Sequence, residues 1–182
     1  MRDMQILAVV VTHNRRLLLS RCLDNLLAQT RQLDQILVVN NASIDGTVEM
    51  LEQRDIPFIT QENLGSAGGW HRGIQYALDH GFDAVWLMDD DGFPDAMALG
   101  LLEVALLPDI ACAASVVVRE DLPNDFVFHL PVLNSMDLPV IWGQTRKLVS
   151  MNELRVAAPG GTYPFAHLFN GALVSMAAVR KV

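Results

Sequence analysis

The sequence predicts an α/β fold in which a mostly parallel sheet carries helices on both faces. Short runs rich in valine, isoleucine and leucine are apolar throughout, which indicates strands buried on both faces. Between them lie segments whose apolar residues recur every three or four positions, as on one side of a helix. Strand and helix patterns alternate over roughly the first two-thirds of the chain, an order typical of parallel sheets with crossover helices.

We expect strands at residues 6–12, 36–39, 57–61, 84–88, 110–118 and 168–175. We expect five helices: one that begins at about residue 15, one over 47–53, one that ends at residue 80, one from 94 to about 107, and one that begins at 176. The first helix should bury one stripe of residues: Leu19, Cys22, Leu23, Leu26 and Leu27. From Arg119 to Gly161 recurring prolines indicate loops and short edge strands.

Local signals suggest where two of the helices begin and end. Asn14 is a residue type favoured at a helix N-cap, so it is the expected cap of the first helix. Gly65, Gly68 and Gly69 are expected in a loop before the third helix, and Gly81 should end that helix.

Composition narrows the classes of function. The 182 residues include 13 Lys and Arg against 21 Asp and Glu, a net charge of −8, so nucleic acid is not an expected partner. A net negative charge favours binding of a cation, although a modest negative charge is also explained by its effect on solubility alone. Cys22 and Cys112 show no C-x-x-C spacing, which argues against zinc and for free thiols. We find no signal peptide or apolar run of membrane length, and therefore expect a cytoplasmic protein.

The most informative segment ends a buried strand in three consecutive aspartates, Asp89, Asp90 and Asp91. In open α/β sheets, ligands bind at the carboxyl ends of strands. Side chains alternate along a strand, so we expect Asp89 and Asp91 to point one way and Asp90 the other. Carboxylates so close repel each other unless a cation or proton intervenes. Mg²⁺ or Mn²⁺ suits such oxygens; an acidic turn capping the helix at Asp95 is the alternative.

Polar residues also follow the other expected strands. The first strand leads into Thr12, His13, Asn14 and Arg15. Such a group at the start of a helix can bind a base or phosphate, although a plain cap explains Asn14 equally well. Asn40 and Asn41 follow the second strand and could read a pyrimidine edge, whereas residues 45–47 are interpreted as turn chemistry.

A glycine-rich segment, residues 62–73, precedes the acidic strand. Its glycines would let the backbone approach a ligand closely, and the following helix N-terminus would attract phosphate. Arg72 could reach a diphosphate or could instead pair with Asp79. All four polar segments fall at strand ends, so they can line one crevice.

These segments read VVVTHNR, VVNNASIDGT, ENLGSAGGWHRG and WLMDDDGFP. Together, over residues 5–118, they resemble family 2 glycosyltransferases with the GT-A fold. A later segment, FNGALVS from Phe169, is similar to a strand near the acceptor side of that family. The forms AGGWHRG and WLMDDD look most like the galactofuranosyl- and rhamnosyltransferase branch.

The resemblance implies an inverting, metal-dependent transfer from a UDP- or dTDP-linked sugar to a hydroxyl of a cell-surface glycan or lipid-linked acceptor. It implies these nucleotide-sugar contacts: Thr12, Asn14, Arg15, Asn40, Asn41, Asn63, Gly68, Arg72, Asp89 and Asp90. Asp89 and Asp91 would bind Mn²⁺ or Mg²⁺, with Asp91 as the expected direct ligand. Within a single domain, residues 1–118 would form the nucleotide-sugar half and 119–182 the start of the acceptor half.

The chain departs from the family pattern at two points. Asn40 stands where the family usually has aspartate, which removes a charge near the base. The family's catalytic base, an Asp or Glu, is expected beyond Val182, so we expect a truncated chain and assign no base. Contact with the inner face of the cytoplasmic membrane stays open.

Two other classes of protein stay open from the residues alone. The run Met88 to Gly92 resembles the D-x-D-G nucleophile loop of haloacid dehalogenase phosphatases, although that loop normally opens its domain. The second alternative is a non-catalytic module that holds a nucleotide sugar or a partner.

Overall fold

The computed structural model describes residues 3–140, 146–168 and 170–181, and the chain divides into two compact units. The larger unit takes in the residues up to Ser115 and those from Leu168 onward. The smaller unit spans Val116–His167. No helix of the described ranges is long and apolar enough to cross a membrane. Phe169 of the segment FNGALVS lies outside the described residues.

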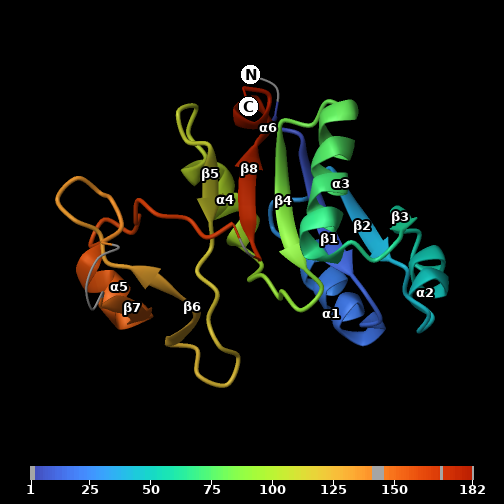
Figure 1. Cartoon of the computed structure of the whole chain (residues 1–182), viewed down its shortest axis with the longest axis horizontal. Helices are drawn as coiled ribbons and strands as arrows, with labels where there is room; N and C mark the ends of the chain where they lie inside the picture. Colours follow the sequence, from blue (N-terminus) through green and yellow to red (C-terminus); the bar gives the residue numbers. More distant parts are fainter. Residues whose placement is uncertain (1–2, 141–145, 169, 182) are drawn as a thin grey trace. The chain divides into compact units, whose positions relative to one another are not determined.

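A sheet that comprises six described strands forms the centre of the larger unit (Figure 1). In spatial order they are β3 (Phe58–Gln61), β2 (Gln35–Asn41), β1 (Ile6–Thr12), β4 (Ala84–Asp89), β8 (Ala172–Ser175) and β5 (Cys112–Ala114). The first four are parallel, whereas β8 is antiparallel to both of its neighbours. The predicted mostly parallel sheet is therefore confirmed.

Helices cover both faces of this sheet. One face carries α1 (Arg16–Leu27), α2 (Thr47–Gln53) and α4 (Ala98–Ala105), and the other carries α3 (Gly65–Asp79) and α6 (Met176–Val179). Alternate residues of β1 serve the two cores, and all seven are buried. Burial on both faces explains why this strand is apolar along its whole length.

Several predicted bounds were wrong. The strand expected over 110–118 is only three residues long in β5, and β8 begins at Ala172. Helix α4 begins at Ala98 and not at Pro94. The residues between form a turn in which the Asp95 carboxylate accepts the amide of Met97 at 3.0 Å. Leu27, expected in the buried stripe of α1, is 51% exposed at the last residue of that helix.

Helix α1 is capped by a residue from another loop. The amide of Arg16 donates to Oδ2 of Asp45 at 2.8 Å, so Asp45 performs the capping predicted for Asn14. Asn14 instead adopts a positive φ of 54° and accepts the amide of Ile44 at 2.8 Å. The other carboxylate oxygen of Asp45 accepts both the amide and the hydroxyl of Thr47, which confirms the predicted turn chemistry.

Glycines let α3 lie close to β1. A Cβ atom at Gly69 would lie 2.5 Å from Val11 Cγ1, and one at Gly73 would lie 2.3 Å from Val9 Cγ1. Helix α3 begins at Gly65, so the prediction that Gly65, Gly68 and Gly69 belong to a loop was wrong. Gly69 and Gly73 are buried inside this helix, one helical turn apart. Their role is helix–sheet packing.

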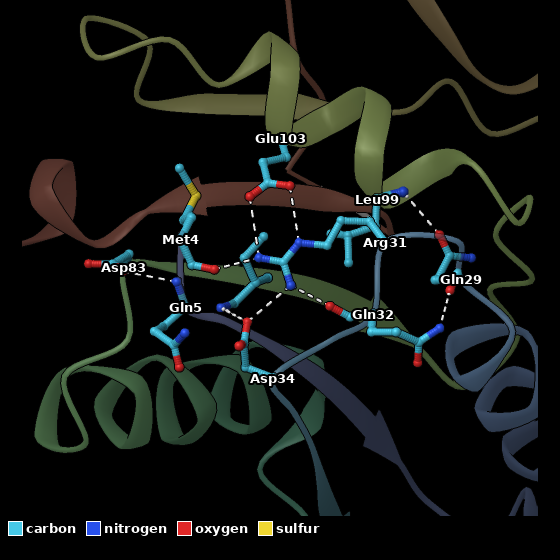
Figure 2. Close-up of polar contacts among 10 residues, drawn as sticks. Met4, Gln5, Gln29, Arg31, Gln32, Asp34, Asp83, Leu99 and Glu103 are labelled. Atoms are coloured by element: carbon cyan, nitrogen blue, oxygen red, sulfur yellow. Dashed lines mark hydrogen bonds and ion pairs between the residues drawn. The ribbon is translucent and has the colours of Figure 1, made fainter. Parts of the chain in front are cut away.

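A polar cluster ties the amino ends of the parallel strands to α4 (Figure 2). The Arg31 guanidinium donates to both oxygens of Glu103, at 3.1 and 3.3 Å, and to Asp34 at 3.2 Å. It also donates to the carbonyl of Met4, while Asp34 accepts the amide of Ile6 at 2.8 Å. This cluster lies where the parallel strands begin, at the opposite end of the sheet from their carboxyl ends. We therefore assign it a role in the stability of the fold.

The smaller unit has a core of its own. Strands β6 (Asp125–Pro131) and β7 (Lys147–Ser150) pair antiparallel, and α5 (Met151–Ala157) follows directly. Apolar side chains from β6 and β7 are buried between these elements. The Ser150 hydroxyl accepts the amide of Glu153 at 3.3 Å and caps α5.

Replacing Gly73 tests the close packing of α3. We expect Gly73→Ala to lower the free energy of unfolding by about 1–3 kcal/mol, the scale of overpacking in a core. The cost arises because the new methyl group meets Val9, and it exceeds the roughly 0.5–1 kcal/mol that alanine gains over glycine in a helix. Urea denaturation measures the change.

Gly100 of α4 provides the matched control. A Cβ atom there would lie 3.7 Å from Arg31 Cβ, an ordinary contact. Gly100→Ala should therefore stabilise the protein by about 0.5–1 kcal/mol. Equal effects of the two substitutions would contradict this account of α3.

Candidate functional site

A cleft of about 410 Å³ opens at the carboxyl ends of β1 and β4. From β1 the chain adds β2 and β3 on one side and then crosses to place β4 on the other. Open α/β sheets bind ligands at such a switch point. The cleft is lined by Val11, Thr12, His13, Arg15, Asn41, Asn63, Gly65, Ser66, Asp89, Asp90 and Asp91. Four polar segments were expected at strand ends. Residues from the other three line this cleft together with the acidic segment, Asp89, Asp90 and Asp91.

All three aspartates line the cleft. We expected Asp90 to point away, because side chains alternate along a strand. However, β4 ends at Asp89, and Asp90 and Asp91 lie in the following turn. Asp90 still bonds to Thr12, and Asp89 to Ser66 of α3, so the predicted opposite orientation of these two side chains is not contradicted; Asp91 shares Nη1 of Arg15 with Asp90.

Asp90 is the anchored member of the three. It is 3% exposed, and its Oδ2 accepts the buried Thr12 hydroxyl at 2.7 Å. Its Oδ1 accepts Nη1 of Arg15 at 3.3 Å. Burial raises the pKa of Asp90 above the ordinary carboxyl value, while the bonds from Thr12 and Arg15 oppose that shift. Asp90 therefore holds the acidic turn against β1.

Asp89 and Asp91 are less enclosed. The side chain of Asp91 is 48% exposed, and its Oδ2 accepts Nη1 of Arg15 at 3.2 Å. Burial, followed by the charges of Asp91 and Asp90, raises the pKa of Asp89, and a hydrogen bond from Ser66 partly offsets this. The three carboxylates thus repel one another at the cleft, and a cation there would relieve the repulsion.

The two predicted asparagines of β2 lie in different surroundings. Asn41 lines the cleft, donates to the carbonyl of Gly65 at 3.1 Å and accepts Gln61 Nε2 at 2.9 Å. Asn40 is fully buried: its amide donates to Thr60 at 3.3 Å and accepts the amide of Ser43 at 3.0 Å. Asn41 thus reaches the wall of the cleft, but it is only 2% exposed and both ends of its amide are engaged within the protein.

Four predicted nucleotide-sugar contacts remain, and one of them lines the cleft. Asn63 lines the cleft and accepts the amide of Gly65 at 3.0 Å. Asn14, Gly68 and Arg72 are not among the described residues that line it. A Cβ atom at Gly68 would lie 2.4 Å from Leu64 Cβ, so this glycine serves a local contact, and Arg72 is exposed on α3.

Residues that we had not assigned also contribute. His13 and Ser66 line the cleft; His13 Nδ1 lies 2.6 Å from the carbonyl of Asn41. Asn170 accepts the amide of Asp89 at 3.3 Å, and a Cβ atom at Gly92 would lie 2.3 Å from its Oδ1. The sequence signal for Asn170 was the segment FNGALVS, but nothing in it indicates a contact with the acidic turn.

The residues fit a divalent cation that shares its shell with a ligand. Carboxylate oxygens suit Mg²⁺ or Mn²⁺, which commonly take one or two carboxylates and complete the shell with phosphate and water. Among the described residues, no group of three or more His, Cys, Asp or Glu could hold a metal ion alone. Asp89 and Asp91 would hold the ion, since Asp90 is 3% exposed and its Oδ2 is engaged by the Thr12 hydroxyl.

Replacing Thr12 tests the anchor of the acidic turn. Thr12→Val keeps the side-chain shape but leaves Oδ2 of a buried carboxylate without its donor. We expect the free energy of unfolding to fall by about 1–3 kcal/mol at neutral pH, the cost of an unsatisfied buried polar group. Urea denaturation measures the loss.

The pH dependence separates this cause from simple loss of packing. The pKa of Asp90 is raised in the folded state, so its ionisation costs stability only above the ordinary carboxyl pKa, about 3.9. Removing the Thr12 hydroxyl enlarges that cost. The loss of unfolding free energy caused by Thr12→Val should shrink as the pH falls through the raised pKa of Asp90. The loss caused by Thr12→Ser should change less with pH. A constant deficit for Thr12→Val would contradict the anchor.

Comparison with known proteins places the chain in a family. Residues 7–162 match the model for Glycosyl transferase family 2. The chain is 37% identical over 175 residues to galactofuranosyltransferase GlfT1 of Mycolicibacterium smegmatis, across 91% of this chain and 54% of the relative. The chain thus spans about half the length of that relative.

Solved structures show the same fold. The mannosyltransferase PcManGT from Pyrobaculum calidifontis, in complex with GDP-Man and Mn²⁺, has a TM-score of 0.54 at 24% identity, over 63% of this chain and 36% of that chain. TarS 1-349 of S. aureus has a TM-score of 0.61 at 15% identity, over 98% of this chain and 49% of that chain. The chain belongs to glycosyl transferase family 2, and it has the GT-A fold.

Proposed function

We propose that the cleft binds the diphosphate of a nucleoside-diphosphate sugar through a divalent cation held by Asp89 and Asp91, and that the protein transfers the sugar to a hydroxyl acceptor. One observation carries this proposal: three carboxylates line a cleft at the β1–β4 switch point, beside polar groups from three other segments. The family and the Mn²⁺ and GDP-Man of PcManGT support it.

Five of the lining residues have a proposed role at the donor. Thr12 and Asp90 hold the acidic turn, while Arg15 and Asn63 lie where they can meet phosphate or ribose. Asn41 is proposed to contact the base, since it lines the cleft and Asn40 does not. When bound, Mn²⁺ or Mg²⁺ would neutralise charge growing on the departing diphosphate.

The donor sugar and the acceptor belong to the same proposal. The similarity to galactofuranosyltransferase GlfT1 supports transfer of a galactofuranosyl group. We propose a UDP- or dTDP-linked donor, inversion at the anomeric carbon, and a hydroxyl acceptor on a cell-surface glycan or a lipid-linked acceptor. We propose residues 1–118 as the nucleotide-sugar half and 119–182 as the start of the acceptor half. We further propose a cytoplasmic location with contact at the inner face of the membrane.

The phosphatase alternative is not favoured. Haloacid dehalogenases normally carry the D-x-D-G loop after their first strand, whereas here the acidic turn follows β4 in a family 2 chain. A non-catalytic module would use the same cleft, so sugar transfer by the protein distinguishes it from an enzyme.

Replacing Asp91 tests the proposed cation. Calorimetric titration of UDP, and separately dTDP, in the presence of Mn²⁺ measures nucleotide binding. We expect Asp91→Ala to weaken UDP binding at least about tenfold, the scale seen when support for a bound metal is removed. Without Mn²⁺, the wild-type protein should bind UDP as weakly as the variant.

Asp79→Ala is the control, because it removes an equal charge from the exposed face of α3. It should bind Mn²⁺ and UDP as the wild type does. If Asp91→Ala retained full metal-dependent binding, the proposed cation site would be wrong.

A further inference from the structure

Arg15 places a positive charge in direct contact with the acidic turn. It immediately precedes α1, and its Nη1 reaches Asp90 Oδ1 at 3.3 Å and Asp91 Oδ2 at 3.2 Å. Among the described residues that line the cleft, it is the only arginine or lysine. One nitrogen thus bridges two of the three carboxylates and offsets part of their repulsion.

The two contacts of Arg15 differ in strength. Asp90 is 5% exposed at its side chain and keeps the Thr12 hydroxyl as a second partner. Asp91 is 48% exposed and Arg15 is 53% exposed. An ion pair exposed to this extent contributes little net stability. The Arg15–Asp91 contact can therefore open with little loss to the fold.

A divalent cation at Asp91 would compete with this guanidinium. Both charges would seek the same carboxylate, and like charges at contact distance repel strongly. The displaced guanidinium would remain in the cleft where a diphosphate is proposed to lie. Its planar fork suits two phosphate oxygens at once.

We propose that Arg15 is a displaceable counter-ion, which pairs with Asp91 and Asp90 in the free protein and moves to the phosphates when cation and nucleotide bind together. The inference rests on the proposed function. Its distinctive consequence is that Arg15 acts in opposite directions on two ligands: it weakens binding of the cation alone and strengthens binding of the cation with a nucleoside diphosphate.

Two titrations of Arg15→Gln test this. Binding of Mn²⁺ alone, followed by the electron paramagnetic resonance of free Mn²⁺, should be about two- to fivefold tighter than in the wild type, the scale of one exposed ion pair. Binding of UDP at saturating Mn²⁺ should be about tenfold weaker or more, the scale of a lost charge-assisted bond. Thermal unfolding of the variant checks that it is folded.

Arg16→Gln is the matched control, because it removes the same charge one residue away, outside the described cleft lining. It should change neither titration appreciably. Arg15→Lys should keep the wild-type affinity for Mn²⁺ alone but bind UDP more weakly, since an ammonium group lacks the planar fork.

The outcomes separate the two proposals. If the wild type binds UDP with Mn²⁺ but Arg15→Gln binds Mn²⁺ no more tightly, this inference is wrong and the proposed function stands. Tighter Mn²⁺ binding with unchanged UDP binding would also overturn it, because Arg15 would then not reach the phosphates. If wild type and variants all fail to bind UDP with Mn²⁺, both proposals fall.

Discussion

The parallel pairing of β1 with β4 is the constraint on which the cleft depends. In this register Val11 lies opposite Asp89, so Thr12 comes level with Asp90 and its hydroxyl reaches that carboxylate at 2.7 Å. A shift by one residue would turn the side chains of β1 to the opposite faces of the sheet. Because β1 is buried on both faces, the apolar core fixes where the acidic turn meets its anchor.

The close approach of α3 depends on the same strand. Gly69 and Gly73 lie against Val11 and Val9, which brings the start of α3 beside the end of β1. The residues at that start, Gly65 and Ser66, form part of the cleft wall. These two glycines therefore shape the cleft indirectly, because they set the distance between helix and sheet.

Much of this arrangement could be predicted because its signals are local. The apolar runs marked the buried strands, and the polar residues after them marked the edge where the cleft opens. Asp89, Asp90 and Asp91 stood out because three adjacent carboxylates after a buried strand repel one another. The family resemblance added the fold, which the comparisons confirm.

What could not be predicted depends on contacts between distant segments. Nothing in the two adjacent asparagines of β2 shows that Thr60 of β3 engages Asn40. The cap of α1 comes from Asp45, thirty positions or so beyond the helix start, so inspection of the residues around Asn14 could not find it. Strand alternation also gives no guide to Asp91, which lies in the turn after β4 and shares Nη1 of Arg15 with Asp90.

We propose that neighbouring carboxylates at the carboxyl end of the sheet share a cation with a diphosphate. Anomalous diffraction at the manganese absorption edge, from crystals grown with Mn²⁺ and UDP, tests it most directly. The account predicts one strong anomalous peak within coordination distance of the Asp91 carboxylate and of both phosphates. Ordered UDP in the cleft without such a peak, or a peak remote from the acidic turn, would contradict it.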